Sequence, residues 1–491
     1  MGNQPSISKN YIYNTLLTVL NIIFPLITFP YVARLLEPDG IGRVNYAQSI
    51  VGYFILLASV GIPAYGIKEV SKARGDRDKL NKVFSELFIL STIFTLVSTL
   101  AYIVLFMFID KMKNDSLLYI ILGGNLILNI FAIDWLYSGI ENYRYITIRS
   151  IVFKVVSFGL IFILIHQKSD YLFYALIFVI AISGANILNM INSRRYVSFS
   201  FRNLDLRRHL KPVFLLFFGG IIASVYKTLD TILLGGMQGD AAVGFYAING
   251  KIVAMSMALI MSLSNVLIPR LSFYLNNRMQ KEYNELASRS LNFIYFLSFP
   301  AIVLLTSFSY ELLFVFGGDK FLAASLALKF LSPIVLLTPL SAFFVFHVLL
   351  PNNQERKMML ATLAGAVVNF TLNMIFIPMF SFNATCAAMS LSEASFVITL
   401  YILSRKYLSI PLFSRGSINY LIGAAGMLGI IFVFRLFISN TLLLFILGTA
   451  TSSAFYILLL LLIKDEFIYK IIGKGKSMLL KILRITPKTK D

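Results

Sequence analysis

Residues 10–63 read NYIYNTLLTVLNIIFPLITFPYVARLLEPDGIGRVNYAQSIVGYFILLASVGIP. They form two apolar runs, 10–34 and 41–63, with only a short polar turn between them. Each run exceeds the roughly 18 residues that allow a helix to cross a bilayer. Lipid offers the backbone no hydrogen-bond partners, so runs of this length should form helices, whereas barrel strands need only about 9 to 11 residues. The stretch therefore predicts two consecutive transmembrane helices.

The same pattern recurs along the 491 residues, of which 58% are hydrophobic and 13% charged, with a mean hydropathy of +0.80. Soluble domains have about 45 to 50% apolar and about 25% charged residues, and a soluble fold could not bury this much apolar surface. We predict an all-α polytopic membrane protein. About fourteen helices are expected, at 10–34, 41–63, 83–109, 116–140, 146–166, 170–191, 212–236, 241–268, 290–308, 323–350, 359–380, 384–404, 416–438 and 441–463.

Some classes of segment and site are not expected. The first run is interrupted by Asn21 and Pro25 and no small-residue cleavage site follows it, so we expect it to be a retained helix rather than a signal peptide. The one cysteine, Cys386, cannot form an intrachain disulfide. The three histidines are widely separated in the sequence, so neither a metal site nor a cofactor is expected.

The positive charge predicts the orientation in the membrane. If the N-terminus is cytoplasmic, 32 of the 43 Lys and Arg residues fall in cytoplasmic segments and six in outer ones. This bias follows the positive-inside rule and predicts that both termini are cytoplasmic, in a protein of the cytoplasmic membrane. The net charge of +20 is thus explained by topology and by anionic membrane lipids, and nucleic-acid binding is not expected.

The order of the runs predicts two lobes of six helices, at 1–200 and 201–406, followed by helices thirteen and fourteen at 407–463 and a basic tail at 464–491. The charged segment 193–212 is the expected linker. ARLLEPDGIGRVNYAQSI resembles TILLGGMQGDAAVGFYAINGKI later in the chain, which suggests a parallel internal repeat. Outer loops are too short for an extramembrane domain, so function should reside among the helices and an enzyme is not expected.

Polar residues recur at helical spacing within several runs. The stripes are Asn14, Thr18, Asn21, Pro25 and Thr28; Asn45, Ser49, Gly52, Ser59 and Pro63; Gly220, Ala223, Lys227 and Asp230; Lys251, Ala258, Ser262 and Asn265; and Thr362, Ala366, Asn369 and Asn373. Close helix packing with interhelical hydrogen bonds could explain any one of them. Several stripes at matching positions of two halves favour a shared water-filled cavity.

Charges within the runs narrow the prediction. A mid-bilayer charge costs about 2.5 to 3.5 kcal/mol on insertion scales and usually faces a cavity or a partner. Lys227 and Asp230 could form a neutralising pair, which leaves Lys251 available for an anionic substrate. Asp134, Asp230 and Glu393 are candidates for proton or cation coupling, with structural hydrogen bonding as the alternative.

Several segments resemble the polysaccharide repeat-unit flippases, the O-antigen and capsule transporters of the multidrug/oligosaccharidyl-lipid/polysaccharide exporter superfamily. The resemblance lies in FPYVARLLEPDGIGRVNYAQSI, GIPAYGIKEVSKARGDRDKL, IDWLYSGIENYRYITIRS, LDTILLGGMQGDAAVGFYAINGKI, VLIPRLS, YELLFVFGGDKFLAASLALKFLSP and VVNFTLNMIFIPMFSFNATCAAMSLSE, in this order over most of 10–405. It implies a two-lobed transporter with alternating access, which carries a short oligosaccharide on undecaprenyl diphosphate and is driven by H⁺ or Na⁺.

The resemblance also suggests residue roles and partners. Arg34, Lys227, Lys251 and Arg270 are the expected anion contacts, although Arg34 and Arg270 could instead anchor lipid head groups. The polar stripes, independently of the resemblance, offer Asn21, Asn45 and Asn369 as further substrate contacts. Other polysaccharide-assembly proteins are possible partners. A multidrug antiporter of the same superfamily is the first alternative, weakened because the first helix carries no carboxylate. A membrane glycosyltransferase, polymerase or ligase is the second.

Overall fold

The computed structural model describes residues 7–408, 410–465 and 467–469. Within its helices, the side chains of 7–22, 218–227, 262–266, 269 and 415 lie outside the description. All regular elements in this described part of the chain are helices, which confirms the predicted all-α class. The chain divides into two compact units, and the first joins Met1–Ile248 with the later segments Val315–Ala323 and Phe370–Thr385.

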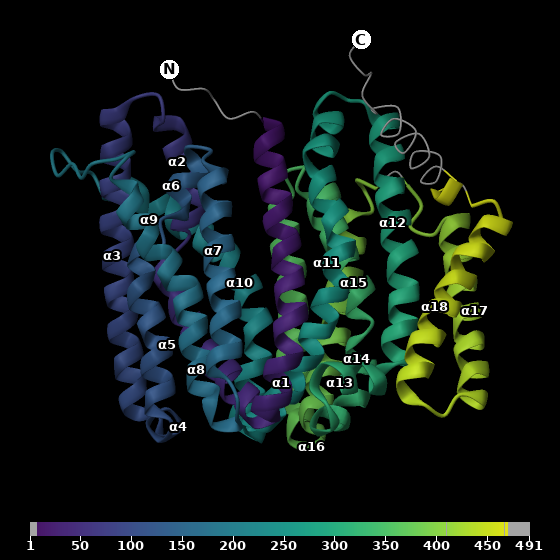
Figure 1. Cartoon of the computed structure of the whole chain (residues 1–491). Coiled ribbons are helices and arrows are strands. Elements are labelled where there is room, and N and C mark those ends of the chain that lie inside the picture. The colour runs from purple at the N-terminus through teal and green to yellow at the C-terminus, as the bar shows by residue number, and fades with distance from the viewer. Residues whose placement is uncertain (1–6, 409, 466, 470–491) are drawn as a thin grey trace, which may run out of the picture. The chain divides into compact units, whose positions relative to one another are not determined.

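The first unit contains the N-terminal helices (Figure 1). They are α1 (Ile7–Ser59), α2 (Ile62–Ala73), α3 (Arg77–Phe108), α4 (Asp110–Asn114), α5 (Ser116–Leu128), η1 (Asn129–Phe131), α6 (Asp134–Gly139), α7 (Tyr143–Leu164), η2 (Lys168–Asp170), α8 (Tyr171–Val179), η3 (Ile180–Gly184), α9 (Ala185–Ser193), α10 (Arg207–Gln238) and the start of α11 (Asp240–Asn276). Helix α1 packs against α3, α5 and α7, and α5 packs against α8.

The second unit comprises Asn249–Phe314, Ala324–Asn369 and Cys386–Asp491. Its helices include most of α11, α12 (Gln280–Ser307), α13 (Ser309–Gly317), α14 (Ser325–Leu331), α15 (Ile334–Ala342), η5 (Phe343–Leu349), part of α16 (Glu355–Ser404), α17 (Arg415–Phe437) and α18 (Thr441–Leu462); η4 (Asp319–Ala324) lies mostly in the first unit. Helices α17 and α18 pack side by side, and α12 packs against α17. The two predicted C-terminal helices therefore belong to this unit.

Two of the longest helices are broken where the sequence predicts a turn. In α1 the backbone at Glu37 is non-helical, between the predicted spans 10–34 and 41–63. In α16 the break is at Ser381, between 359–380 and 384–404. The described residues contain ten helices long and apolar enough to cross a membrane, or eleven if the bent pair Asp319–Leu331 and Ile334–Leu349 forms one span. The predicted count of about fourteen therefore stays a prediction.

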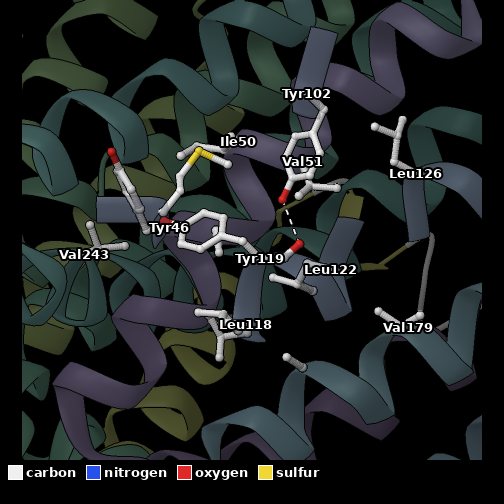
Figure 2. Close-up of a cluster of buried hydrophobic side chains, with 14 of the residues drawn as sticks. Tyr46, Ile50, Val51, Tyr102, Leu118, Tyr119, Leu122, Leu126, Val179 and Val243 are labelled. Carbon is white, nitrogen blue, oxygen red and sulfur yellow. Dashed lines mark hydrogen bonds between the residues drawn. The ribbon is translucent and has the colours of Figure 1, made fainter. Parts of the chain in front are cut away.

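A cluster of buried side chains forms the core of the first unit (Figure 2). Tyr102 of α3 donates its hydroxyl hydrogen bond to the backbone oxygen of Tyr119 in α5 at 2.7 Å, so the one polar atom of this ring is paired among apolar neighbours. Leu234, Val243 and Ile377 belong to the same cluster. The first unit thus includes the ends of helices that the sequence assigns to the second lobe.

The predicted linker between the lobes is bound to α3. Backbone N–H groups of Ser200 and Asp205 donate to the Ser85 hydroxyl and to the Glu86 carboxylate, each at 2.8 Å. Glu86 is fully buried and also lies 2.9 Å from Nε2 of the buried His209. A buried carboxylate needs such partners to offset its lost hydration. The segment is consequently held against α3 at its middle, through Ser200 and Asp205, and near its end, through His209.

Helix α3 begins at a side-chain cap. The Asp76 carboxylate accepts hydrogen bonds from the backbone N–H groups of Asp78 and Lys79, at 3.1 and 3.2 Å. Such a cap satisfies donors that the first helical turn leaves unpaired. The bonds from Lys79 lower the pKa of Asp76 below its ordinary value because they stabilise the ionised carboxylate.

Candidate functional site

A fully buried carboxylate, Asp230, is the centre of the candidate site. It lies on α10 and accepts a hydrogen bond from the Tyr246 hydroxyl of α11 at 3.0 Å. The side-chain amide of Asn373 on α16 donates to its other oxygen at 2.7 Å. All three residues belong to the first compact unit, although they lie up to 143 positions apart in the chain. Three helices therefore converge on one acidic group.

The chemistry of this group suits a proton or a small cation. An ionised carboxylate has about four acceptor sites and can bind a proton or a hard cation as well as hydrogen-bond donors. Asn373, which is also fully buried, brings an amide oxygen that can act as a ligand to hard cations. The hydrogen bonds from Tyr246 and Asn373 lower the cost of burying the Asp230 carboxylate.

Two backbone turns of the same unit face each other with matching geometry. Glu37 has φ 58° and ψ 179°, and Gly239, 202 positions later, has φ 82° and ψ −177°. A Cβ atom on Gly42 would lie 1.7 Å from the Asp240 carbonyl oxygen, and a Cβ atom on Gly244 would lie 1.9 Å from that of Pro38. The contacts are reciprocal. The internal repeat predicted from the sequence thus supplies two equivalent turns that touch through their glycines.

Ion pairs surround these turns. Lys111 lies 2.7 Å from Asp240 and donates to the Gly235 carbonyl oxygen at 2.8 Å. Glu37 lies 3.4 Å from Lys168 and 3.9 Å from Lys320. These pairs are partly exposed, and an exposed pair contributes about 0 to 1 kcal/mol. These ion pairs therefore contribute little to the stability of the contact between the two turns, and their main effect is on the orientation of the turns.

Glu37 provides a direct test of the turn. Its φ and ψ lie in a region adopted almost only by glycine, and such strain costs about 1 to 3 kcal/mol. We expect Glu37→Gly to raise the Tm of the purified protein, because the relief of strain exceeds the loss of two partly exposed ion pairs. Glu37→Gln is the control, since it removes the charge but keeps the strain, and it should lower the Tm slightly. Equal Tm values for the two variants would contradict this account.

The other coupling candidates are engaged in separate networks. Asp134, at the start of α6, pairs with the buried Arg149 at 2.8 Å and accepts a hydrogen bond from Asn189 at 2.7 Å. Glu393, in the second unit, is buried and accepts a hydrogen bond from Ser341 at 2.8 Å. Asp230 is the candidate on which three separate helices, α10, α11 and α16, converge.

The predicted substrate contacts are divided between the two units: Arg34 and Asn45 lie in the first, and Lys251, Arg270 and Asn369 lie in the second. Arg34 donates to the Val315 carbonyl oxygen at 2.9 Å, and Asn45 donates to the Ile41 carbonyl oxygen within its own helix at 2.8 Å. Asn369 is buried and donates to Ser392 at 3.4 Å. Lys251 and Arg270 are exposed side chains of α11. The side chains of Asn21 and Lys227 lie outside the described residues, so the Lys227–Asp230 pair stays a prediction.

Comparison with known proteins identifies this architecture. The family model described as "Polysaccharide biosynthesis protein" matches residues 7–275, and a second model, MatE, matches 216–375. The first match spans more than half of the chain. The chain belongs to the polysaccharide biosynthesis protein family.

Named relatives of this family member lie in enteric and Gram-positive bacteria. A protein of Escherichia coli (strain K12) that is named as an O-antigen transporter is 26% identical over 379 residues, which cover 75% of this chain and 90% of the relative. The capsular polysaccharide biosynthesis protein CapF of Staphylococcus aureus is 20% identical over 400 residues, covering 80% and 98%. The resemblance inferred from the sequence motifs is confirmed.

Solved structures share the fold of this family member. The lipid II flippase MurJ in an inward closed conformation aligns with a TM-score of 0.74 at 14% identity, over 94% of this chain and 99% of that chain. An inward-facing multidrug resistance transporter of the MATE family aligns with a TM-score of 0.65 at 13% identity, over 81% and 98%. The protein is therefore a multi-pass membrane protein with the fold of these transporters.

The sequence alone predicts part of this candidate site. Asp230 was predicted, and Asn373 belongs to a predicted polar stripe, but Tyr246 was not singled out. The only feature of the sequence that points to Tyr246 is its position in the segment TILLGGMQGDAAVGFYAINGKI. The close approach of the two turns at Gly42 and Gly244 could not be predicted from the sequence beyond the presence of these glycines, because it depends on how the helices pack.

Proposed function

We propose that this protein is a flippase that moves a lipid-linked oligosaccharide from the cytoplasmic to the outer leaflet of the bacterial inner membrane. The cargo lipid is undecaprenyl diphosphate, and transport proceeds by alternating access. The family match, the O-antigen transporter relative and the transporter fold support this proposal. Both termini are cytoplasmic in it, as the distribution of Lys and Arg indicates.

The single observation that carries the mechanism is the burial of Asp230 among donors from other helices. An intramembrane carboxylate is costly and is commonly a coupling site in transporters. Binding of H⁺ or Na⁺ neutralises it, and its release restores a buried negative charge. Cation binding therefore changes the relative stability of the conformation in which Tyr246 and Asn373 donate to Asp230. This change in stability links the cation gradient to the conformational change.

The facing turns are proposed to close the outer side in the state that the structure shows. The predicted orientation places Glu37, Gly42, Gly239 and Gly244 at the outer ends of their helices. Close backbone packing excludes water and substrate from that side. Opening to the outside requires these turns to separate, with loss of the reciprocal glycine contacts and of the Lys111–Asp240 ion pair.

The diphosphate is proposed to bind the cations Lys251, Arg270, Lys227 and Arg34. Lys251 is the sharpest case, because its side chain is exposed on a membrane-spanning helix and no ion pair or hydrogen bond joins it to the described part of the chain. A hydrogen bond between charged groups contributes about 1.5 to 3 kcal/mol. We expect Lys251→Gln to reduce surface polysaccharide by roughly ten- to a hundredfold while drug resistance stays unchanged.

The control for this variant is Lys281→Gln, an exposed lysine near the start of α12, which should export polysaccharide normally. Quantitative surface labelling in a strain that lacks the native protein provides the measurement. A change in drug resistance with unaltered polysaccharide would favour the antiporter alternative, which the MatE match keeps open.

The proposal as a whole is tested in proteoliposomes. Purified protein and a fluorescent undecaprenyl-diphosphate oligosaccharide are reconstituted, and the fraction of label accessible from one side is followed in time. Transport predicts a change of sidedness without a change in the glycan. Formation of new glycosidic bonds would instead support an enzyme of polysaccharide assembly.

A further inference from the structure

A separate cavity lies inside the first compact unit, among α1, α5, α8 and η3. Its volume is about 210 Å³, and its lining is mostly apolar, with Gln48, Asn125 and Asn129 as the polar residues. Phe178 and Gly52 contribute to its wall, and a Cβ atom on Gly52 would meet no heavy atom within 4 Å. The cavity is distinct from the Asp230 centre, with which it shares no lining residue.

The polar groups of the cavity are available to a ligand. Asn125 accepts a hydrogen bond from the Ser183 hydroxyl at 2.8 Å, whereas the amides of Gln48 and Asn129 form no hydrogen bond with the described residues. Ser183 lies in η3, a short π-helical segment. Such segments are rare and often occur at functional sites. Here the π-helix brings Ser183 to Asn125 at the edge of the cavity.

The lining determines which chemical class fits. It contains no charged residue, so neither a phosphate nor a metal cation would find a counter-charge there. Each amide has both donors and an acceptor, which matches hydroxyl groups that also donate and accept. Phe178 adds an apolar wall of the kind that covers the C–H face of a ring. These features suit an uncharged ring that carries several hydroxyl groups.

The volume sets the size of the ligand. Pockets for drug-sized ligands have about 300 to 1,000 Å³, and this cavity is smaller. Its volume corresponds to roughly seven water molecules at about 30 Å³ each. One six-membered sugar ring matches this space, whereas an entire oligosaccharide does not.

We propose that this cavity binds one uncharged hexopyranose ring of the lipid-linked oligosaccharide, apart from the cations that bind the diphosphate. This inference rests on the proposed function. Gln48 and Asn129 hydrogen-bond the ring hydroxyls, and Phe178 packs against its apolar face. Substrate recognition then has two parts, a charge-dependent contact with the lipid diphosphate and a neutral contact with a sugar.

The test compares two probes on the full-length protein in nanodiscs: undecaprenyl diphosphate that carries one hexose, and the same lipid without sugar. We expect the wild type to bind the glycosylated probe about tenfold more tightly, as two neutral hydrogen bonds would provide. Gly52→Leu fills the cavity and should remove this tenfold difference. Gln48→Leu removes one amide at similar size and should reduce the difference to about threefold.

Both variants should bind the sugar-free lipid as the wild type does. The matched control is Gly159→Leu in α7, another helical position where an added Cβ meets no heavy atom within 4 Å. It should retain the full tenfold difference, and its Tm monitors the general effect of the substitution. An unchanged difference in Gly52→Leu, or equal binding of both probes by the wild type, would overturn the sugar-site inference. Failure of the wild type to bind either lipid would instead contradict the proposed function.

Discussion

Gly244→Ala is expected to abolish polysaccharide export, with a loss of roughly a hundredfold or more. The new methyl carbon would lie 1.9 Å from the Pro38 carbonyl oxygen, where no Cβ atom can remain. Because the obstacle is backbone, it cannot rotate away as a side chain can, and the two facing turns must separate. Gly42→Ala should have the same effect from the other side, since its methyl would lie 1.7 Å from the Asp240 carbonyl oxygen.

The matched control is Gly250→Ala in the same helix, where an added Cβ meets no heavy atom within 4 Å. Export is measured by surface polysaccharide in a strain without the native protein, and protein abundance by immunoblot. A folding-independent measurement uses Ile41→Cys, because Ile41 is fully buried and the native Cys386 is buried as well. Separated turns should make this cysteine reactive toward a membrane-impermeant maleimide in the Gly244→Ala background. Normal export and an unreactive cysteine would contradict the proposed closure.

Asp230→Asn is expected to remove coupling to the cation gradient. The substitution keeps the size of the side chain but removes the charge to which Tyr246 and Asn373 donate. Charge-assisted hydrogen bonds contribute about 1.5 to 3 kcal/mol each, so gradient-driven transport should fall by roughly ten- to a hundredfold. Proteoliposomes with an imposed H⁺ or Na⁺ gradient provide the measurement, and they also identify the coupling cation.

The control for Asp230 is Asp110→Asn, an exposed carboxylate at the start of α4 whose recorded ion pair is with Lys113. It should respond to the gradient as the wild type does. Tyr246→Phe removes the hydroxyl donor to Asp230 and should give an intermediate loss. If Asp230→Asn were still stimulated by the gradient, coupling would have to reside elsewhere, with Asp134 and Glu393 as the next candidates.

The helical architecture could be predicted because its cause is local. The apolar runs 41–63 and 384–404 are long enough to span a bilayer, and the turns before them coincide with the backbone breaks at Glu37 and Ser381. The resemblance to the flippases was found in the same way, from motifs a few residues long. The linker illustrates the limit. Its charge predicted a connection between lobes, but not its attachment to Glu86.

The candidate site could be predicted only in part. Asp230 stands out in the sequence because it is an acidic residue in an apolar run, and its predicted neighbour was Lys227 on the same helix. The structure adds Tyr246 and Asn373 from other helices. Helical periodicity states which face of its own helix a residue occupies, and it carries no information about which other helix that face meets.

By itself, the sequence determined that this chain is a bundle of membrane helices, because apolar length and the need for internal backbone hydrogen bonds act within each segment. The tertiary structure alone decided that Gly42 and Gly244 touch the opposite turn, that Asp230 meets Asn373, and that Gln48 and Asn129 line one cavity. These contacts join residues far apart in the chain, and they depend on how the helices pack rather than on the preference of any one of them.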